Sequence, residues 1–146
     1  MTQDELLQVI RQAARDGVTE LDLSGNELKE LPPEIGQLTQ LEKLTLGKFD
    51  EQTFQSVGNQ LSSLPAEIGQ LQNLSQLYLS DNQLSSLPAE IGQLQNLSEL
   101  YLSNNLSLPI PPEIVDNPYE PQKIINYYLQ SRVEPSRPLN EAKVLL

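Results

Sequence analysis

A near-perfect internal duplication constrains the fold of this chain more than any other feature. Residues 61–82 and 84–105 are offset by 23 positions. They differ only where the first segment has Gln76 and Asp81 and the second has Glu99 and Asn104. A fixed period of about 20–50 residues is typical of chains that stack one supersecondary unit several times. The sequence therefore predicts a solenoid with a continuous core rather than a globular bundle.

The duplicated unit extends to four copies, which begin at Val18, Leu41, Leu74 and Leu97. They share the pattern L-x-x-L-x-L-x-x-N-x-L-x-x-L-P-x-x-I-x-x-L, which resembles the leucine-rich-repeat signature. The resemblance implies the α/β fold class: a leucine-rich-repeat solenoid with a short parallel concave sheet, short helical turns on the convex side, and helical caps at both ends.

Each part of the repeated pattern has a physical reason. Alternate side chains of a strand point to opposite faces, so Leu77 and Leu79 should enter the core while Gln76 and Tyr78 face outward. The following Pro breaks the extended segment, and E-I-G-Q-L should then form a helical turn whose Ile91 closes the core from behind. One coil cannot bury its own apolar face, but stacked coils can.

The repeated Asn and Pro positions are expected to be structural. In the leucine-rich-repeat family such an Asn forms a ladder, because its amide bonds backbone groups of adjacent turns that would otherwise be buried and unpaired. The ladder positions here are Asn26, Asn59, Asn82 and Asn105, and the Pro positions are Pro32, Pro65, Pro88 and Pro111.

The N-terminal end should be covered by a helix. Residues 1–17 predict this capping helix, in which Thr2 and Glu5 fit a capping box and Gly17 suits the C-terminal end. The four repeats then occupy residues 18–117. The helix is expected to shield the open core of the first coil.

The C-terminal end departs from the repeat. Leu106 stands one position early in the fourth copy, with Ser107 where the other copies have Leu. Residues 118–131 predict a C-terminal capping helix whose apolar spacing would face the core. Residues 132–146 are expected to be a linker and the start of a truncated following domain, because the chain ends in a strand-like AKVLL. The apolar positions of this capping helix are Ile124, Ile125, Tyr128 and Leu129.

Composition narrows the possible functions. The absence of Cys and His from the sequence predicts no disulfides, no zinc site of the usual kind and no imidazole base. A net charge of -11 disfavours nucleic acid and anionic membranes as partners. No apolar run approaches the ~20 residues of a bilayer span, and the start lacks a secretory pattern. We expect a cytoplasmic protein without a cofactor or metal.

Three stretches carry a closer resemblance. They are ELLQVIRQAARDGVTELDLSGNEL, LTLGKF…SVGNQLSSLP and PPEIVDNPYEPQKIINYYLQ…PLNEAKVLL. Together they resemble the N-terminal leucine-rich-repeat domain of a bacterial, cyanobacterial-type Roco protein. In that family a segment like the last one leads into the first strand of a Ras-like Roc GTPase domain. The resemblance implies a non-catalytic interaction and regulatory domain of a multidomain GTPase.

The pattern G-x-x-x-x-G-K-[ST] does not occur in this sequence, so we expect the chain by itself not to act on nucleotides and not to be an enzyme. The expected partner is another protein or the parent's own GTPase module. The alternatives are a free-standing leucine-rich-repeat interaction protein and, less compatible with a chain lacking Cys, a repeat-containing ligase effector.

The outward positions of the concave strands are the first candidate partner-binding surface. Tyr78 and Tyr101 should stack in adjacent coils ~5 Å apart, and paired exposed tyrosines suit an interface. The alternative is that near-identical repeats merely show the same residue twice. The candidate positions are Glu20, Asp22, Lys43, Thr45, Gln76, Tyr78, Glu99 and Tyr101.

An insertion in the second repeat is the other candidate. Its residues 47–58 contain both Phe residues of the chain, Phe49 and Phe54. The loop could contact a partner or the following domain. Alternatively, it is a tolerated bulge whose Phe side chains pack onto the core. The carboxylates of the concave face are not expected to form an acid–base pair, because an open sheet encloses no pocket.

Overall fold

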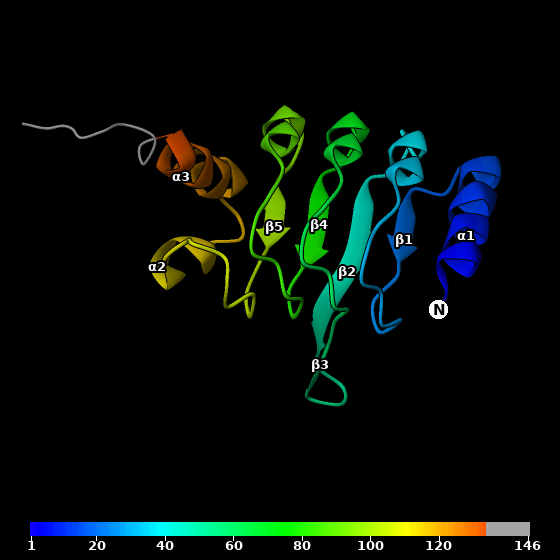
Figure 1. Ribbon diagram of the computed structural model, residues 1–146, viewed down its shortest axis with the longest axis horizontal. Coiled ribbons are helices and arrows are strands. Elements are labelled where there is room, and N and C mark those ends of the chain that lie inside the picture. The colour runs from blue at the N-terminus through cyan, green and yellow to red at the C-terminus, as the bar shows by residue number, and fades with distance from the viewer. Residues whose placement is uncertain (134–146) are drawn as a thin grey trace, which may run out of the picture.

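Four coils lie side by side between helices at both ends in the computed structural model, which describes residues 1–133 (Figure 1). Helix α1 (Gln3–Asp16) stands at one end, and helices α2 (Pro112–Val115) and α3 (Pro121–Val133) stand at the other. The linker predicted from residue 132 does not begin there, because α3 continues through Val133. The remainder of that prediction, residues 134–146, lies outside the described residues.

Strands from successive coils form one parallel sheet in the order β1-β2-β4-β5. Its strands are β1 (Glu20–Asp22), β2 (Lys43–Asp50), β4 (Gln76–Leu79) and β5 (Glu99–Tyr101). Strand β3 (Gln55–Val57) pairs antiparallel with the far end of β2. Each E-I-G-Q segment forms a 3-10 helix behind the sheet, as predicted: η1 (Pro33–Gln37), η2 (Ala66–Gln70) and η3 (Ala89–Gln93). The predicted solenoid fold is confirmed.

The core lies between the sheet and the column of 3-10 helices. Leu77 and Leu79 are fully buried from the strand side, and Ile91 is fully buried from the 3-10 side. Burying one such side chain contributes about 1.5–3 kcal/mol relative to leaving it exposed. The same positions repeat in each coil, so the buried side chains form one continuous cluster.

The predicted asparagine ladder forms at Asn59, Asn82 and Asn105, whereas the Asn26 side chain donates to the carbonyls of Leu23 and Ser24 in its own coil. The Asn82 Nδ2 donates to the carbonyl of Leu46 in the preceding coil at 3.2 Å, and its Oδ1 accepts from the amide of Leu61 at 3.1 Å. Asn59 makes the equivalent bonds to the first coil, and Asn105 to the third. These side chains pair backbone groups that a tight turn leaves without a ladder partner, which prevents the cost of burying them unpaired.

The N-terminal cap forms as predicted. The amide of Glu5 donates to Thr2 Oγ1, and the amide of Thr2 donates to the Glu5 carboxylate, which completes the capping box. Gly17 ends the helix in the left-handed conformation at φ 64°. The helix places Leu6 and Ile10, both fully buried, against the first coil.

The C-terminal cap uses the predicted residues and one feature that the pattern did not predict. Ile124, Ile125 and Tyr128 are buried, as expected. The hydroxyl of Tyr128 also accepts a hydrogen bond of 2.9 Å from the amide of Leu87, so the cap satisfies a backbone donor as well as the apolar core. The sheet edge is closed where the amide of Leu100 donates to the carbonyl of Pro118.

The fourth coil fills its core differently from the other three. Leu106, which stands one position early, is 95% exposed and does not replace the missing core leucine. Leu108 is buried instead, and its amide donates to the carbonyl of Asn105 in a turn. The buried leucine thus lies one residue later than the regular position 107, and Ile110 is buried in its regular place.

Candidate protein-interaction surface

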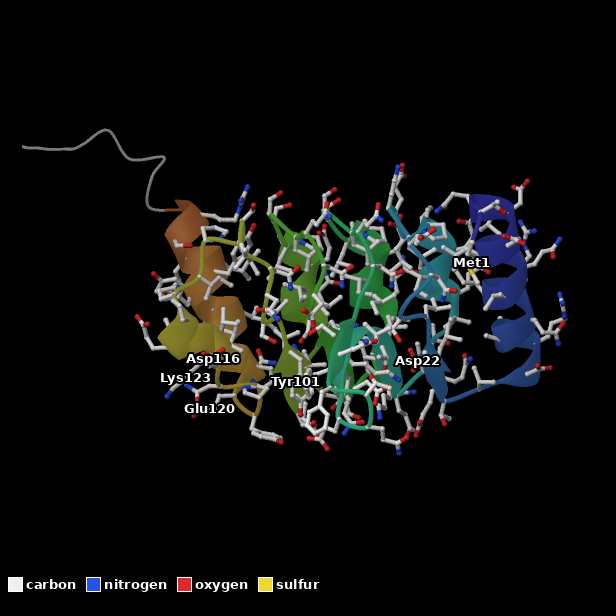
Figure 2. The ribbon with its side chains drawn as sticks, turned by 90° about the horizontal axis from the view of Figure 1, so that it is seen from below. Met1, Asp22, Tyr101, Asp116, Glu120 and Lys123 are labelled. Carbon is white, nitrogen blue, oxygen red and sulfur yellow. The ribbon has the colours of Figure 1, made fainter. Side chains whose placement is uncertain are left out.

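The strand register assembles the predicted concave positions into two rows. Glu20, Lys43, Gln76 and Glu99 form one row across the four strands, and Asp22, Thr45, Tyr78 and Tyr101 form the other. Asp22 and Tyr101 lie along the same side of the molecule, in different coils (Figure 2).

Thr45 is the exception among these positions. It lies in register with Tyr78, but it is only 5% exposed and offers almost no surface to a partner. The short Thr side chain lines the same small hollow as the longer Lys43, Lys48 and Tyr78 side chains. The expectation that Thr45 contributes to a binding surface is therefore wrong.

The tyrosines of neighbouring coils stack, as predicted. The ring centroids of Tyr78 and Tyr101 are 4.3 Å apart, and the ring planes differ by 17°. Tyr119, which precedes α3, adds a third ring, edge-on to Tyr101 at 6.4 Å. On the other side, the Lys43 ammonium lies 5.1 Å from the centre of the Tyr78 ring, within cation–π range.

A carboxylate holds the tyrosine stack in place. The Tyr101 hydroxyl donates to Glu99 at 2.7 Å, and the Gln76 amide donates to the other oxygen of that carboxylate at 2.7 Å. The bond from Tyr101, followed by the bond from Gln76, lowers the pKa of Glu99. Burial, followed by the bond to Glu99, raises the pKa of the Tyr101 phenol above its usual range. Glu99 is thus the ionised acceptor and Tyr101 the neutral donor.

An ion pair joins the insertion to the first coil. Lys48 Nζ lies 2.7 Å from Asp22 Oδ2, and both side chains are about half exposed at 40% and 48%. Burial raises the pKa of Asp22, but the bonds from Lys48 and Ser24 outweigh this effect, so the pKa is lowered. Pairs this exposed typically contribute only about 0–1 kcal/mol, so the pair mainly orients the Lys48 side chain.

The insertion is a β-hairpin that continues β2 past its neighbours and returns through β3; it projects beyond the other coils (Figure 1). Phe49 is 53% exposed and Phe54 is 80% exposed, with ring centroids 6.5 Å apart. The alternative in which both rings pack onto the core is therefore wrong. The sequence reveals the two rings but not their exposure, because strand pairing within the insertion decides where they point.

Two glycines fix the base of this hairpin. A Cβ on Gly47 would lie 1.7 Å from the carbonyl oxygen of Ser80, and a Cβ on Gly58 would lie 1.7 Å from the carbonyl oxygen of Asp81. Both approaches admit only hydrogen in place of a side chain. The hairpin therefore leaves and re-enters the solenoid along a path that the third coil specifies.

A groove of about 620 Å3 separates the hairpin from the tyrosines. The hairpin contributes Lys48, Phe49, Asp50 and Glu51, and the opposite side contributes Tyr78, Tyr101 and Tyr119 above the Ser80 and Ser103 side chains. The sequence places Lys48, Asp50 and Glu51 in the candidate insertion but does not mark them, or Tyr119, as contact residues. Tyr119 lies outside the repeats, so the periodicity carries no signal for its position.

The carboxylates on the concave face do not resemble an acid–base pair. A general acid near neutral pH needs a raised carboxyl pKa, whereas the pKa values of Asp22 and Glu99 are both lowered. Among residues 1–133, no group of three or more acidic side chains is arranged to hold a metal ion. Over the same residues, no helix has the length and hydropathy needed to cross a membrane.

Comparison with known proteins identifies the repeats. One leucine-rich-repeat family model matches residues 57–106, and another matches residues 17–38. No curated protein matches significantly. The protein therefore contains a leucine-rich-repeat domain, a kind of domain that generally binds other proteins and is typically non-catalytic.

Solved structures with similar repeats come from diverse sources. A plant peptide hormone receptor, RGFR1 in complex with RGF2, is 36% identical over 55% of this chain and 12% of its own, with a TM-score of 0.44. A leucine-rich-repeat protein of Leptospira interrogans is 35% identical over 64% and 33%, with a TM-score of 0.33. The repeat domain of the type III effector XopL is 30% identical over 56% and 35%, with a TM-score of 0.38. This chain thus spans about a third or less of each solved chain.

Proposed function

We propose that the concave face is a protein-recognition surface and that the domain does its work by binding rather than by catalysis. The observation that carries this proposal is the stack of Tyr78 on Tyr101, half-exposed on the concave sheet. Tyrosines are enriched among residues that dominate binding energy, because each offers a large apolar ring and a polar tip.

The stack is held in place before any partner arrives. Glu99 fixes the Tyr101 hydroxyl, and Lys43 lies over the outer face of Tyr78. Binding costs entropy for each flexible side chain that must be ordered, about 0.5–1.5 kcal/mol. Rings already held by neighbours avoid part of this cost, which favours a binding role over a chance repetition of the same residue in duplicated coils.

We further propose that this domain belongs to a bacterial Roco protein, where it would bind either an external protein or the parent's own GTPase module in the cytoplasm. The three sequence stretches at the start, in the insertion and at the end of the chain support this proposal. A test is to read the coding sequence beyond Leu146. A G-x-x-x-x-G-K-[ST] motif shortly downstream supports the proposal, and a stop codon there favours the free-standing interaction protein.

The concave-face proposal is tested by affinity capture followed by titration calorimetry with the purified partner. The double variant Tyr78→Ala/Tyr101→Ala should weaken binding of the partner about ten-fold or more, since loss of each anchoring side chain typically costs over ~1 kcal/mol of binding free energy. The matched control is Glu67→Ala/Glu90→Ala on the convex 3-10 helices. Circular dichroism verifies folding of both variants. Loss of binding in the control variant alone would mean that the binding site lies on the convex side.

A further inference from the structure

We propose that the groove between the hairpin and the tyrosines receives a Lys- or Arg-containing segment of the partner protein, with its cationic side chain between the aromatic rings and the carboxylates of Asp50 and Glu51. This inference rests on the proposed function and adds the chemistry of the partner. It concerns the groove in which the two predicted tyrosines meet Tyr119 and the hairpin.

The aromatic residues of the chain gather at this groove. Five of the seven Phe and Tyr residues lie there: Phe49, Tyr78, Tyr101 and Tyr119 line it, and Phe54 packs edge-on against Phe49. Tyr119 is 72% exposed and Phe54 is 80% exposed. Contacts at Gly47 and Gly58 hold the backbone of the hairpin in place. Aromatic rings that stay exposed on such a fixed backbone are costly in water and are typical of a binding surface.

The charges in the groove favour a cationic occupant. Lys48, the basic residue of the groove lining, already pairs with Asp22, and Lys43, outside the lining, lies over Tyr78. Within residues 1–133, the Asp50 carboxylate accepts a hydrogen bond only from the amide of Gln52, and neither Asp50 nor Glu51 forms an ion pair. An incoming ammonium or guanidinium group would neutralise these two carboxylates.

The same surface already binds a cation of its own. The position of Lys43 over Tyr78 shows that the negative face of a tyrosine on this sheet attracts an ammonium group. Tyr119 and Phe49 offer ring surface of the same kind on either side of the groove. Arginine fits such a site well, because its planar guanidinium stacks on rings while its N–H groups bond carboxylates.

The net negative charge of the whole chain also favours a basic partner. A net charge of -11 attracts basic partners and repels acidic ones at distances within the Debye length, about 8–10 Å at physiological salt. This long-range attraction is not specific to the groove, so the test must separate it from the local contacts.

The probe is a pentapeptide of alternating glycine and arginine, blocked at both ends, titrated into labelled protein and followed by two-dimensional amide NMR. We expect shifts centred on residues 48–51 and 119. The same peptide with citrulline, an uncharged isostere of arginine, should bind about ten-fold more weakly, in keeping with the range of cation–π and charge-assisted contacts. Equal binding of both peptides, or no shift with either at millimolar concentration, would overturn the proposal.

Two matched variants separate the groove from the overall charge. Asp50→Lys/Glu51→Lys alters the groove, and Glu67→Lys/Glu90→Lys alters the convex side. Each variant replaces two negative charges by two positive ones, so both change the net charge from -11 to -7. The groove variant should bind the arginine peptide about ten-fold more weakly than the convex variant. Equal losses in both variants would show that only net charge matters and would contradict the inference.

The captured partner distinguishes this inference from the proposed function. In one outcome, Tyr78→Ala/Tyr101→Ala abolishes binding of the partner, and Asp50→Lys/Glu51→Lys leaves the affinity within two-fold. The concave face is then the recognition surface, and the proposal of a cationic occupant in the groove is wrong. If both variants lose the partner and the arginine peptide competes with it, both proposals hold. An unchanged affinity of the partner for both variants contradicts both proposals.

Discussion

Leu106 and Leu108 lie two positions apart in the last repeat, yet they have opposite environments. Leu106 is 95% exposed and Leu108 is 7% exposed. Both leucines flank Ser107, which stands at the position that leucine occupies in the other coils, so the repeat pattern does not choose between them. A turn closed by the Asn105 carbonyl places Leu108 in the core. At the scale of single residues, the local backbone decides which leucine contributes to stability.

Alanine substitution at these two leucines should therefore give different results. Leu108→Ala should lower the free energy of unfolding by about 2 kcal/mol, at the low end for buried leucines because the site lies near the rim. Leu106→Ala should change it by no more than about 0.5 kcal/mol. Urea denaturation followed by circular dichroism measures both values. A larger loss for Leu106→Ala would mean that Leu106 occupies the core.

Glu99 should give the stability a measurable dependence on pH. Its pKa is lowered in the folded protein, first by the bond from Tyr101 and then by the bond from Gln76, so it stabilises the fold above its unfolded pKa of about 4.5. This stabilisation disappears as the pH falls through the lower folded pKa. Glu99→Gln should flatten the decline of the melting temperature between pH 5 and pH 3.

The matched control for this pH series is Glu90→Gln on 3-10 helix η3, since Glu90 accepts no side-chain hydrogen bond from residues 1–133. Glu90→Gln should leave the pH profile close to that of the unmodified protein. Equal flattening by both substitutions would indicate that general charge repulsion, and not the bonds to Tyr101 and Gln76, causes the decline.

Among the elements, the hairpin of β2 and β3 takes its direction from contacts with a neighbouring coil. Its strands pair with each other from Lys48 to Val57, beyond the register of the parallel sheet. Its base depends on the third coil, because Gly47 and Gly58 touch the carbonyl groups of Ser80 and Asp81. The direction of the hairpin, and hence one wall of the groove, is set by contacts between an insertion and a regular repeat.

Adding one methyl group at the base should displace this element. Gly47→Ala places a Cβ 1.7 Å from the Ser80 carbonyl oxygen, so the backbone must move, at a cost of about 1–3 kcal/mol. Gly92→Ala is the control, because its nearest neighbour is the movable Leu129 Cδ1 at 3.3 Å. Denaturation gives the two stabilities, and amide NMR should show shifts in residues 48–57 for Gly47→Ala only. An unshifted hairpin in that variant would contradict the close contact.

At the scale of the whole molecule, the end caps complete the core. Helix α1 packs beside η1, and α3 packs beside η3. Each cap adds buried apolar side chains to a cluster that otherwise extends only between neighbouring coils. A solenoid is stabilised by such nearest-neighbour interfaces, so an uncovered terminal coil loses one of its two partners.

Removing the N-terminal cap should therefore affect the entire domain. Deleting residues 1–17 uncovers the first coil, including fully buried Ile35, and removes the burial of Leu6 and Ile10, worth about 1.5–3 kcal/mol each. We expect a lower melting temperature by circular dichroism and association by size-exclusion chromatography. Arg11→Ala/Arg15→Ala on the exposed side of α1 should leave both unchanged. A shortened chain that stays monomeric with an unchanged melting temperature would contradict the capping role.

The sequence by itself determined the features that repeat. A period of 23 residues, the alternation of Leu77 and Leu79 with outward side chains, and the ladder asparagines predicted the solenoid, its core and the tyrosine stack. These features follow from local periodicity, because each coil takes the same position relative to the next.

Only the tertiary structure decided what lies outside the repeat. Four features depend on contacts between segments of different pattern: the burial of Thr45, the burial of Leu108 rather than Leu106, the exposure of Phe49 and the position of Tyr119 beside Tyr101. Such contacts leave no periodic trace in the sequence, since each occurs once. The groove arises from contacts of this kind: a unique hairpin and a unique cap come together on either side of a repeated surface, and packing fixes the distance between them.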